Sequence, residues 1–152
     1  IFSDVWQTTS LSARRGIISA ALSAVDMALW DLVGKSLQTP VYELLGIFSD
    51  QVPCYASAGL YGKDKDQHAL ADEMRGYLDQ GFSDVKMKVG GVPLDQDLER
   101  VKAVREAIGP SARLMVDANY TLNVPRSLKM ACAFEPYDVY WFEAPVSPDD
   151  LL

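Results

Sequence analysis

Apolar residues recur at helical spacing near the start of the chain. Between Ser12 and Gly34 they follow one another at intervals of three and four, which predicts one long helix with a buried side. Gly34 is placed to end this helix, and Pro40 precedes a short helical turn from Val41 to Leu45. The residues that follow form a connector, and a different pattern begins at Val52.

The rest of the chain alternates between strand and helix patterns. Short stretches rich in β-branched and aromatic residues predict four strands, and apolar residues at helical spacing predict a helix between each pair. This alternation implies a parallel sheet. The predicted strands are Val52–Ala58, Ser83–Val89, Arg113–Asp117 and Val139–Phe142, and the predicted helices are Asp66–Gln80, Asp95–Ile108 and Pro125–Phe134.

Two parallel architectures fit this alternation: an open doubly wound sheet and a closed eight-stranded barrel. The open sheet usually carries a glycine-rich phosphate loop after its first strand. Here that position is occupied by residues 56–62, with two glycines that are wrongly spaced for a GxGxxG motif. The sequence therefore favours the barrel.

The charge balance limits the kinds of partner. Fourteen Lys and Arg against twenty-one Asp and Glu give a net charge of −7, which argues against a nucleic-acid surface or an anionic membrane face. The most apolar stretch is interrupted by Asp26 and Asp31, and no basic region followed by an apolar one begins the chain. We expect a cytoplasmic protein with a small-molecule partner.

The two cysteines do not suggest a metal site. Cys54 and Cys132 lie far apart in apolar surroundings, with no CxxC motif or Cys/His cluster nearby. Both are expected to be buried, reduced thiols.

Two lysines lie close together in the second predicted strand. The strand period of two places Lys86 and Lys88 on one face, and the neighbouring apolar residues on the other. An exposed strand with solvated lysines is the ordinary explanation, but it fits poorly where helices cover the outer face. Like charges at short range and partial burial both disfavour a protonated lysine, which makes the amine a usable base. Lys88, nearer the strand end, is the predicted base.

Acidic residues end the third and fourth predicted strands. Asp117 completes an apolar run and is followed by Asn119, so it is a candidate ligand for a hard cation and also a suitable cap for the next turn. Glu143 follows aromatic residues, and Pro145 then prevents the strand from continuing. A rim or capping carboxylate is the alternative for Glu143.

Considered together, these four charges favour a functional site. Active sites of parallel barrels lie at the C-terminal ends of the strands, where all four residues fall. Magnesium prefers octahedral oxygen coordination and retains waters, so two or three carboxylates with substrate oxygens would hold it.

Four segments resemble the mandelate racemase and muconate lactonizing branch of the enolase superfamily. They are AVDMALWDLVGK (residues 24–35), VKMKVG (85–90), MVDAN (115–119) and WFEAPV (141–146). The last three are specific in this order and spacing. The resemblance implies an α/β fold in which residues 49–152 form the first half of a (β/α)7β TIM-type barrel. Residues 1–48 would then be the C-terminal part of an α+β capping domain and a connector.

The resemblance also implies a role for each candidate residue. Lys88 matches the lysine that removes the proton, and Lys86 matches the one that tunes it and lies near the substrate carboxylate. Asp117 and Glu143 match the first two of three Mg²⁺ ligands. Asn119 matches a polar neighbour that orients substrate or ligand.

The implied chemistry is removal of the proton α to a carboxylate through an enediolate stabilised by Mg²⁺. Dehydration of an acid sugar, or racemisation of a 2-hydroxy acid, would follow. A muconate-cycloisomerase or dipeptide-epimerase type of enzyme is an alternative, and a non-catalytic half-barrel is an alternative of another class. The family is usually assembled from several subunits, so a homo-oligomer is expected.

Both ends of the chain are expected to be cut, because it starts at Ile1 rather than at a Met and stops just after residues 147–150, which would begin another element. The third metal ligand, the second acid/base and strands five to eight of the family are expected to lie outside it. Four strands of eight would leave open edges, so this stretch by itself is expected to be inactive and to oligomerise or aggregate.

Overall fold

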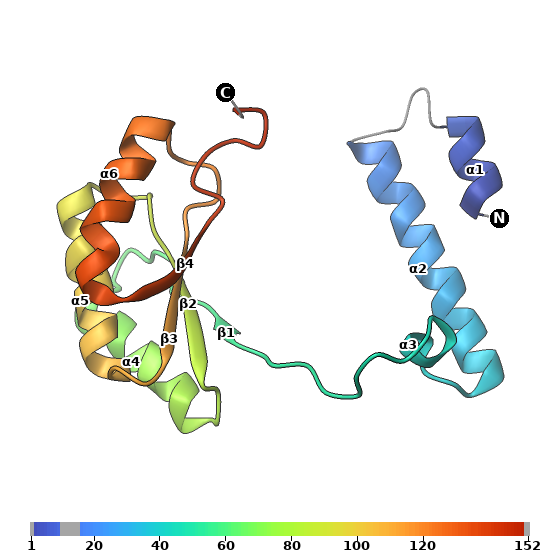
Figure 1. Ribbon diagram of the computed structural model, residues 1–152, viewed down its shortest axis with the longest axis horizontal. Coiled ribbons are helices and arrows are strands. Elements are labelled where there is room, and N and C mark those ends of the chain that lie inside the picture. Colours follow the sequence, from blue (N-terminus) through green and yellow to red (C-terminus); the bar gives the residue numbers. More distant parts are fainter. Residues whose placement is uncertain (1, 10–15, 151–152) are drawn as a thin grey trace. The chain divides into compact units, whose positions relative to one another are not determined.

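The computed structural model describes residues 2–9 and 16–150 (Figure 1). The chain divides into two compact units, Ile1–Val52 and Pro53–Leu152. The described residues of the first unit form three helices, and the second unit contains a parallel sheet with its helices.

The helices of the first unit are α1 (Phe2–Thr9), α2 (Ile17–Leu37) and α3 (Val41–Leu44). The predicted start of α2 at Ser12 lies outside the described residues, and its predicted end at Gly34 was wrong. The helix continues to Leu37 and is capped by Gln38 in the left-handed region, with φ of 53°. Gly34 is instead a packing position, because a Cβ there would lie 2.9 Å from the Thr39 carbonyl oxygen.

The predicted buried side of α2 is not found within this unit. Among its described residues only Gly34 is buried, and Ile17 is 86% exposed. By length and composition α2 could cross a membrane, which is weak evidence because core helices of soluble proteins pass the same test. The apolar periodicity predicted a helix correctly, but it does not show which surface covers that helix.

The second unit is a four-stranded parallel sheet in the order β1-β2-β3-β4. Helices α4, α5 and α6 lie on one face of it (Figure 1). The strands are β1 (Ala56–Ser57), β2 (Asp84–Lys88), β3 (Arg113–Asp117) and β4 (Val139–Glu143), and the helices are α4 (Gln67–Asp79), α5 (Leu94–Ile108), α6 (Val124–Phe134) and the 3₁₀ helix η1 (Glu135–Tyr137).

Alternate residues of the strands build the core beneath these helices. Val85 and Met87 of β2 and Leu114 and Val116 of β3 are fully buried, as expected for the helix-covered face of a parallel sheet. Side chains cap the N-termini of two helices. At α4 the Asp66 carboxylate accepts from the Ala69 amide, and at α6 the Asn123 side-chain oxygen accepts from the Arg126 amide. Other buried apolar residues of this core are Leu70, Met74, Val101, Val104, Met130 and Phe134.

Most predicted elements are confirmed to within one or two residues. The first strand is shorter than predicted, because only Ala56 and Ser57 pair with β2 before the chain leaves the ladder near Gly59. The expectation of buried cysteines was wrong, since Cys54 and Cys132 are both exposed. Cys132 lies off the buried face of α6, and Cys54 lies in the segment before β1.

Candidate active site

The strand register brings the candidate residues to one level of the sheet. In the parallel ladders Lys88 pairs with Asp117, and Asp117 pairs with Glu143. Paired residues of parallel strands point to the same face. These side chains therefore share the face opposite the helices, together with Lys86.

A β-bulge between β3 and β4 is needed for this alignment. Leu114 pairs with Val139, but the next residue, Met115, pairs with Trp141 rather than with Tyr140. Without this extra residue Asp117 would pair with Phe142. Because a shift of one residue turns a side chain to the other face, the bulge is what places Glu143 beside Asp117.

Two short ion pairs and one longer one connect the four side chains. The Nζ atom of Lys86 donates to Oε2 of Glu143 at 2.6 Å and lies 3.8 Å from Oδ2 of Asp117. The Nζ atom of Lys88 donates to the same Oδ2 atom at 2.6 Å. The side chain of Asp117 is 4% exposed and that of Glu143 is 41% exposed, so the cluster opens to solvent at Glu143.

Asn119 lies just beyond the end of β3, in the left-handed region with φ of 45°. Its backbone amide donates to Oδ1 of Asp117 at 2.9 Å. The turn-capping role considered for Asp117 is thus present alongside the ion pairs. Asn119 itself is exposed, and its proposed role in substrate binding stays a prediction.

The charges around Lys86 and Asp117 favour their ionised forms. Burial alone would lower the pKa of Lys86, but hydrogen bonds to Glu143 and Tyr55 outweigh it, and the pKa is raised. Burial likewise would raise the pKa of Asp117, but the hydrogen bonds from Lys88 and from the Asn119 amide lower it overall. The expectation that a neighbouring lysine would disfavour the charged form was wrong for Lys86, because its ammonium group binds the Glu143 carboxylate and Tyr55.

Aromatic residues flank the cluster on the same face. The Lys86 ammonium lies 5.3 Å from the ring centroid of Tyr55, which packs edge-on against Trp141 at 5.4 Å. Such contacts stabilise a cation in a partly desolvated setting.

Sequence reasoning missed a polar group at the end of β2, formed by Tyr61, Asp97 and Arg100. Asp97 is completely buried and accepts hydrogen bonds from both of the others. A signal was present, since Asp97 occupies the buried face of α5 with Val101 and Val104, at helical spacing. A carboxylate in an apolar stripe requires a partner.

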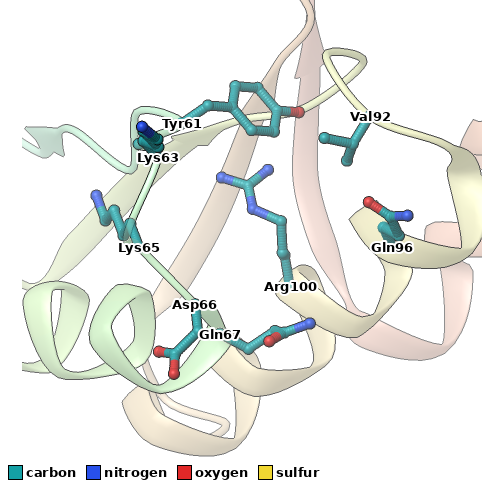
Figure 2. Close-up of a pocket in the computed structure, with 9 residues that line it drawn as sticks. Tyr61, Lys63, Lys65, Asp66, Gln67, Val92, Gln96 and Arg100 are labelled. Carbon is teal, nitrogen blue, oxygen red and sulfur yellow. The ribbon is translucent and has the colours of Figure 1, made fainter.

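A cavity of about 380 Å³ borders Tyr61 and Arg100 (Figure 2). None of the five predicted site residues lines it. This cavity is therefore separate from the lysine and carboxylate cluster. Its lining residues are Tyr61, Gly62, Lys63, Lys65, Asp66, Gln67, Val92, Gln96 and Arg100.

The donor set of the cluster fits part of a magnesium site. Asp117 and Glu143 offer carboxylate oxygens on adjacent strands, which are the ligands that Mg²⁺ prefers. Within residues 2–9 and 16–150 no group of three or more His, Cys, Asp or Glu side chains could hold a metal. Two carboxylates are compatible with Mg²⁺ because this ion keeps several of its waters.

Comparisons with known protein families agree over most of the chain. Residues 2–46 match the mandelate racemase / muconate lactonizing enzyme N-terminal domain, and residues 69–152 match the enolase C-terminal domain-like family.

Individual relatives cover nearly the whole chain. It is 36% identical to an arabinonate dehydratase from Saccharolobus solfataricus, over 99% of this chain and 40% of that protein. It is 40% identical to a 3,6-anhydro-alpha-L-galactonate cycloisomerase from Streptomyces coelicolor, over 100% of this chain and 42% of that protein. A solved racemase from the same organism, with bound magnesium, superposes with a TM-score of 0.89 at 38% identity, over 99% of this chain and 45% of that one. The chain thus spans about 40% of the length of these curated relatives.

Proposed function

Because this chain belongs to the mandelate racemase and muconate lactonizing enzyme family of the enolase superfamily, we propose that the whole protein removes the proton α to a carboxylate. Lys88 is the base, and Asp117 and Glu143 hold Mg²⁺. The leading substrate class is an acid sugar that undergoes dehydration, because most of the similar relatives are named for that reaction. The main support for this proposal is that the side chains of two lysines and two carboxylates meet at the ends of three adjacent strands.

Each side chain of the cluster has a part in this proposal. Bound Mg²⁺ would supply positive charge beside the substrate carboxylate, which stabilises the enediolate. Lys88 would accept the α-proton as the neutral amine, and so must release the hydrogen bond that it now donates to Asp117. Lys86, held by Glu143 on the same face, adds a second positive charge for the carboxylate. The Asn119 backbone amide fixes the orientation of Asp117, and the Asn119 side chain would contact substrate.

Replacing Lys88 tests the base assignment. In the full-length protein, Lys88→Met should lower α-proton exchange at least about a hundredfold, the usual contribution of a general base. Deuterium exchange into arabinonate, L-rhamnonate and D-gluconate would be followed by NMR, since relatives are named for these acids. Magnesium affinity should be retained.

Lys102→Met is the matched control, because Lys102 is an exposed lysine of α5 that pairs only loosely with Glu106. It should exchange like the wild type. Full exchange by Lys88→Met would remove Lys88 from the base role.

A second candidate is cycloisomerisation of a sugar acid. It is favoured by the 40% identity to a 3,6-anhydro-alpha-L-galactonate cycloisomerase. The same proton abstraction would begin either reaction, so product analysis distinguishes them: dehydration yields a 2-keto acid, and cycloisomerisation yields an isomer of unchanged mass.

We further propose a cytoplasmic enzyme of several subunits with a small carboxylate as its partner, and with neither nucleic acid nor membrane. The net charge of −7 supports the absence of nucleic acid. The charged residues Asp26, Asp31 and Lys35 within α2, and the family match across it, support a soluble helix rather than a membrane span.

A further inference from the structure

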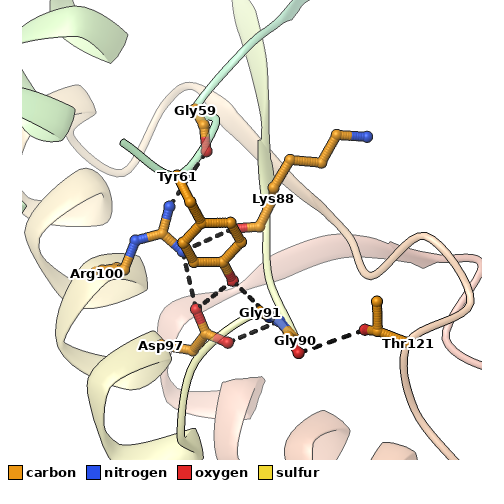
Figure 3. A network of polar contacts seen from close by, with 8 residues as sticks. All are labelled: Gly59, Tyr61, Lys88, Gly90, Gly91, Asp97, Arg100 and Thr121. Atoms are coloured by element: carbon orange, nitrogen blue, oxygen red, sulfur yellow. Dashed lines mark hydrogen bonds and ion pairs between the residues drawn. The ribbon is translucent and has the colours of Figure 1, made fainter. Parts of the chain in front are cut away.

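The backbone that carries Lys88 leaves the sheet directly after this residue, and side chains bind its polar groups there (Figure 3). The Lys88 carbonyl oxygen accepts from Nη1 of Arg100 at 2.9 Å. The Gly90 amide donates to Oδ2 of Asp97 at 2.7 Å, and the Gly91 amide donates to the Tyr61 hydroxyl at 2.9 Å. Three backbone groups within four residues are thus held by three side chains, which we name the β2 clamp: Tyr61, Asp97 and Arg100.

The members of the β2 clamp also hold one another. Oδ1 of Asp97 accepts from the Tyr61 hydroxyl and from Nη1 of Arg100, both at 2.8 Å. The Arg100 guanidinium lies 3.9 Å from the Tyr61 ring centroid. Burial raises the pKa of Tyr61 to about 12, so its hydroxyl remains a donor at neutral pH. The three members of the β2 clamp therefore form one connected network of contacts.

Close packing leaves the clamped segment little room. A Cβ at Gly91 would lie 2.6 Å from the Tyr61 ring, and one at Gly90 would lie 2.5 Å from Oγ1 of Thr121. Arg100 also donates to the Gly59 carbonyl at 3.2 Å, which connects the chain after β1 to the same network. The ends of β1 and β2 are fixed together.

The β2 clamp and the reactive amine lie on opposite sides of the Lys88 backbone. The Lys88 carbonyl points to Arg100, while its side chain extends away and reaches Asp117 (Figure 3). In the described part of the chain, the hydrogen bonds of the clamp side chains reach none of Lys86, Asp117 and Glu143. The β2 clamp therefore acts on the site through the backbone, chiefly that of residues 88–91.

We propose that Tyr61, Asp97 and Arg100 are positioning residues that fix the Lys88 amine relative to the substrate α-carbon, an inference that rests on the base role proposed for Lys88. A misplacement of about 1 Å at a reacting group costs on the order of a hundredfold in rate. Loosening the backbone anchor should therefore slow proton transfer without weakening substrate or metal binding.

Two mild variants of the full-length protein test this. Tyr61→Phe removes the hydroxyl but keeps the ring beneath Arg100, and Asp97→Asn removes the charge but keeps the shape. We expect kcat for α-proton exchange to fall about ten- to hundredfold. KM for the same exchange reaction should change less than about threefold. The Mg²⁺ dissociation constant, measured by calorimetry, should likewise change less than about threefold. Glu99→Gln is the matched control, because Glu99 lies on α5 and bonds only Gln67 of α4 at the surface.

A second readout does not depend on turnover. In protein labelled with ¹⁵N-lysine, the Lys88 ammonium signal is identified by its loss in Lys88→Met. It should shift or broaden in Tyr61→Phe and Asp97→Asn, and keep its position in Glu99→Gln. An unchanged Lys88 signal in both clamp variants, or a lower unfolding temperature with unchanged kcat, overturns the proposal.

The two proposals fail in different ways. If Lys88→Met exchanges normally, the base assignment falls. If Lys88→Met is inactive while both clamp variants exchange at the wild-type rate, only the positioning role falls. Equal losses of Mg²⁺ affinity and exchange rate in the clamp variants would also overturn the positioning role, because they would mean that the whole site had been disturbed.

Discussion

At the scale of single residues, Asp117 is the most constrained group of the site. Its Oδ2 atom faces both lysines, and its Oδ1 atom accepts from the Asn119 amide. Glu143 is bound only by Lys86 and is far more exposed. A carboxylate has about four acceptor positions, so each can keep its present partner and still bind a cation. Glu143 is the better residue for probing the metal, because changing it disturbs fewer contacts.

Glu143→Gln should weaken Mg²⁺ binding in the full-length protein at least about tenfold, which corresponds to roughly 1.4 kcal/mol. The physical reason is that an amide oxygen replaces a full negative charge at a hard cation. Calorimetric titration with Mg²⁺ measures the change. Glu106→Gln, at an exposed position of α5, is the control and should bind Mg²⁺ like the wild type. An unaltered titration for Glu143→Gln would exclude Glu143 from the metal site.

At the scale of elements, a second polar group joins the strands at the end opposite the site. Asp84 begins β2 and accepts from the side chain of Arg113, which begins β3, with Oδ2 and Nη2 2.6 Å apart. The Arg113 guanidinium also lies 4.8 Å from the ring centroid of Tyr140 on β4. Side-chain hydrogen bonds from Arg113 lower the pKa of the Asp84 carboxyl below its usual 3.8. Three strands are thus connected where they begin.

This lowered pKa predicts a pH-dependent contribution to stability. A carboxyl group with a lower pKa in the folded state stabilises the fold above its unfolded pKa, and this contribution is lost as the pH falls through the folded value. Asp84→Asn should therefore lower the midpoint of urea unfolding at pH 7. The difference in midpoint between this variant and the wild type should shrink below about pH 3.8. Asp72→Asn, on the exposed side of α4, is the control. A difference that stays constant from pH 7 to pH 3 would contradict the ion-pair interpretation.

At the scale of the whole molecule, each unit has an uncovered surface. In the described residues 53–150, helices lie on one face of the sheet, and Trp141 on the other face is 37% exposed. Parallel sheets are usually covered on both faces. In the described residues of the first unit, apolar side chains of α2 such as Met27 and Leu32 are each 63% exposed. Exposed apolar surfaces of this kind mark sites of contact with other protein surfaces.

We predict that a second copy of this chain packs against part of the exposed apolar surface of α2. The full-length protein should sediment as a species larger than one chain, because burying a leucine or methionine side chain contributes about 1.5–3 kcal/mol. Met27→Lys and Leu32→Lys should each shift the distribution toward smaller species. Lys102→Glu, a charge change at an exposed position of α5, should leave it unchanged. A single-chain mass for the wild type across micromolar concentrations would disprove the assembly.

Much of the fold and site followed from the sequence. The strand period placed Lys86 and Lys88 on one face, and the carboxyl ends of the strands placed Asp117 and Glu143 near them. The shared face of the two lysines is a local consequence of residue order, so it does not depend on distant packing. The α/β class and the order of strands and helices are fixed in the same way.

Tertiary structure alone decided the features that join distant segments. The bulge that aligns Glu143 with Asp117 arises from how β4 pairs with β3, and no pattern within either strand specifies it. The Glu143 carboxylate that helps to raise the pKa of Lys86, against the expectation from sequence, comes from another strand. The β2 clamp likewise unites Tyr61 with Asp97 across thirty-six residues of sequence. Sequence periodicity fixes the face on which a side chain lies, but only packing fixes its neighbours, because those contacts form between elements that are far apart in the chain.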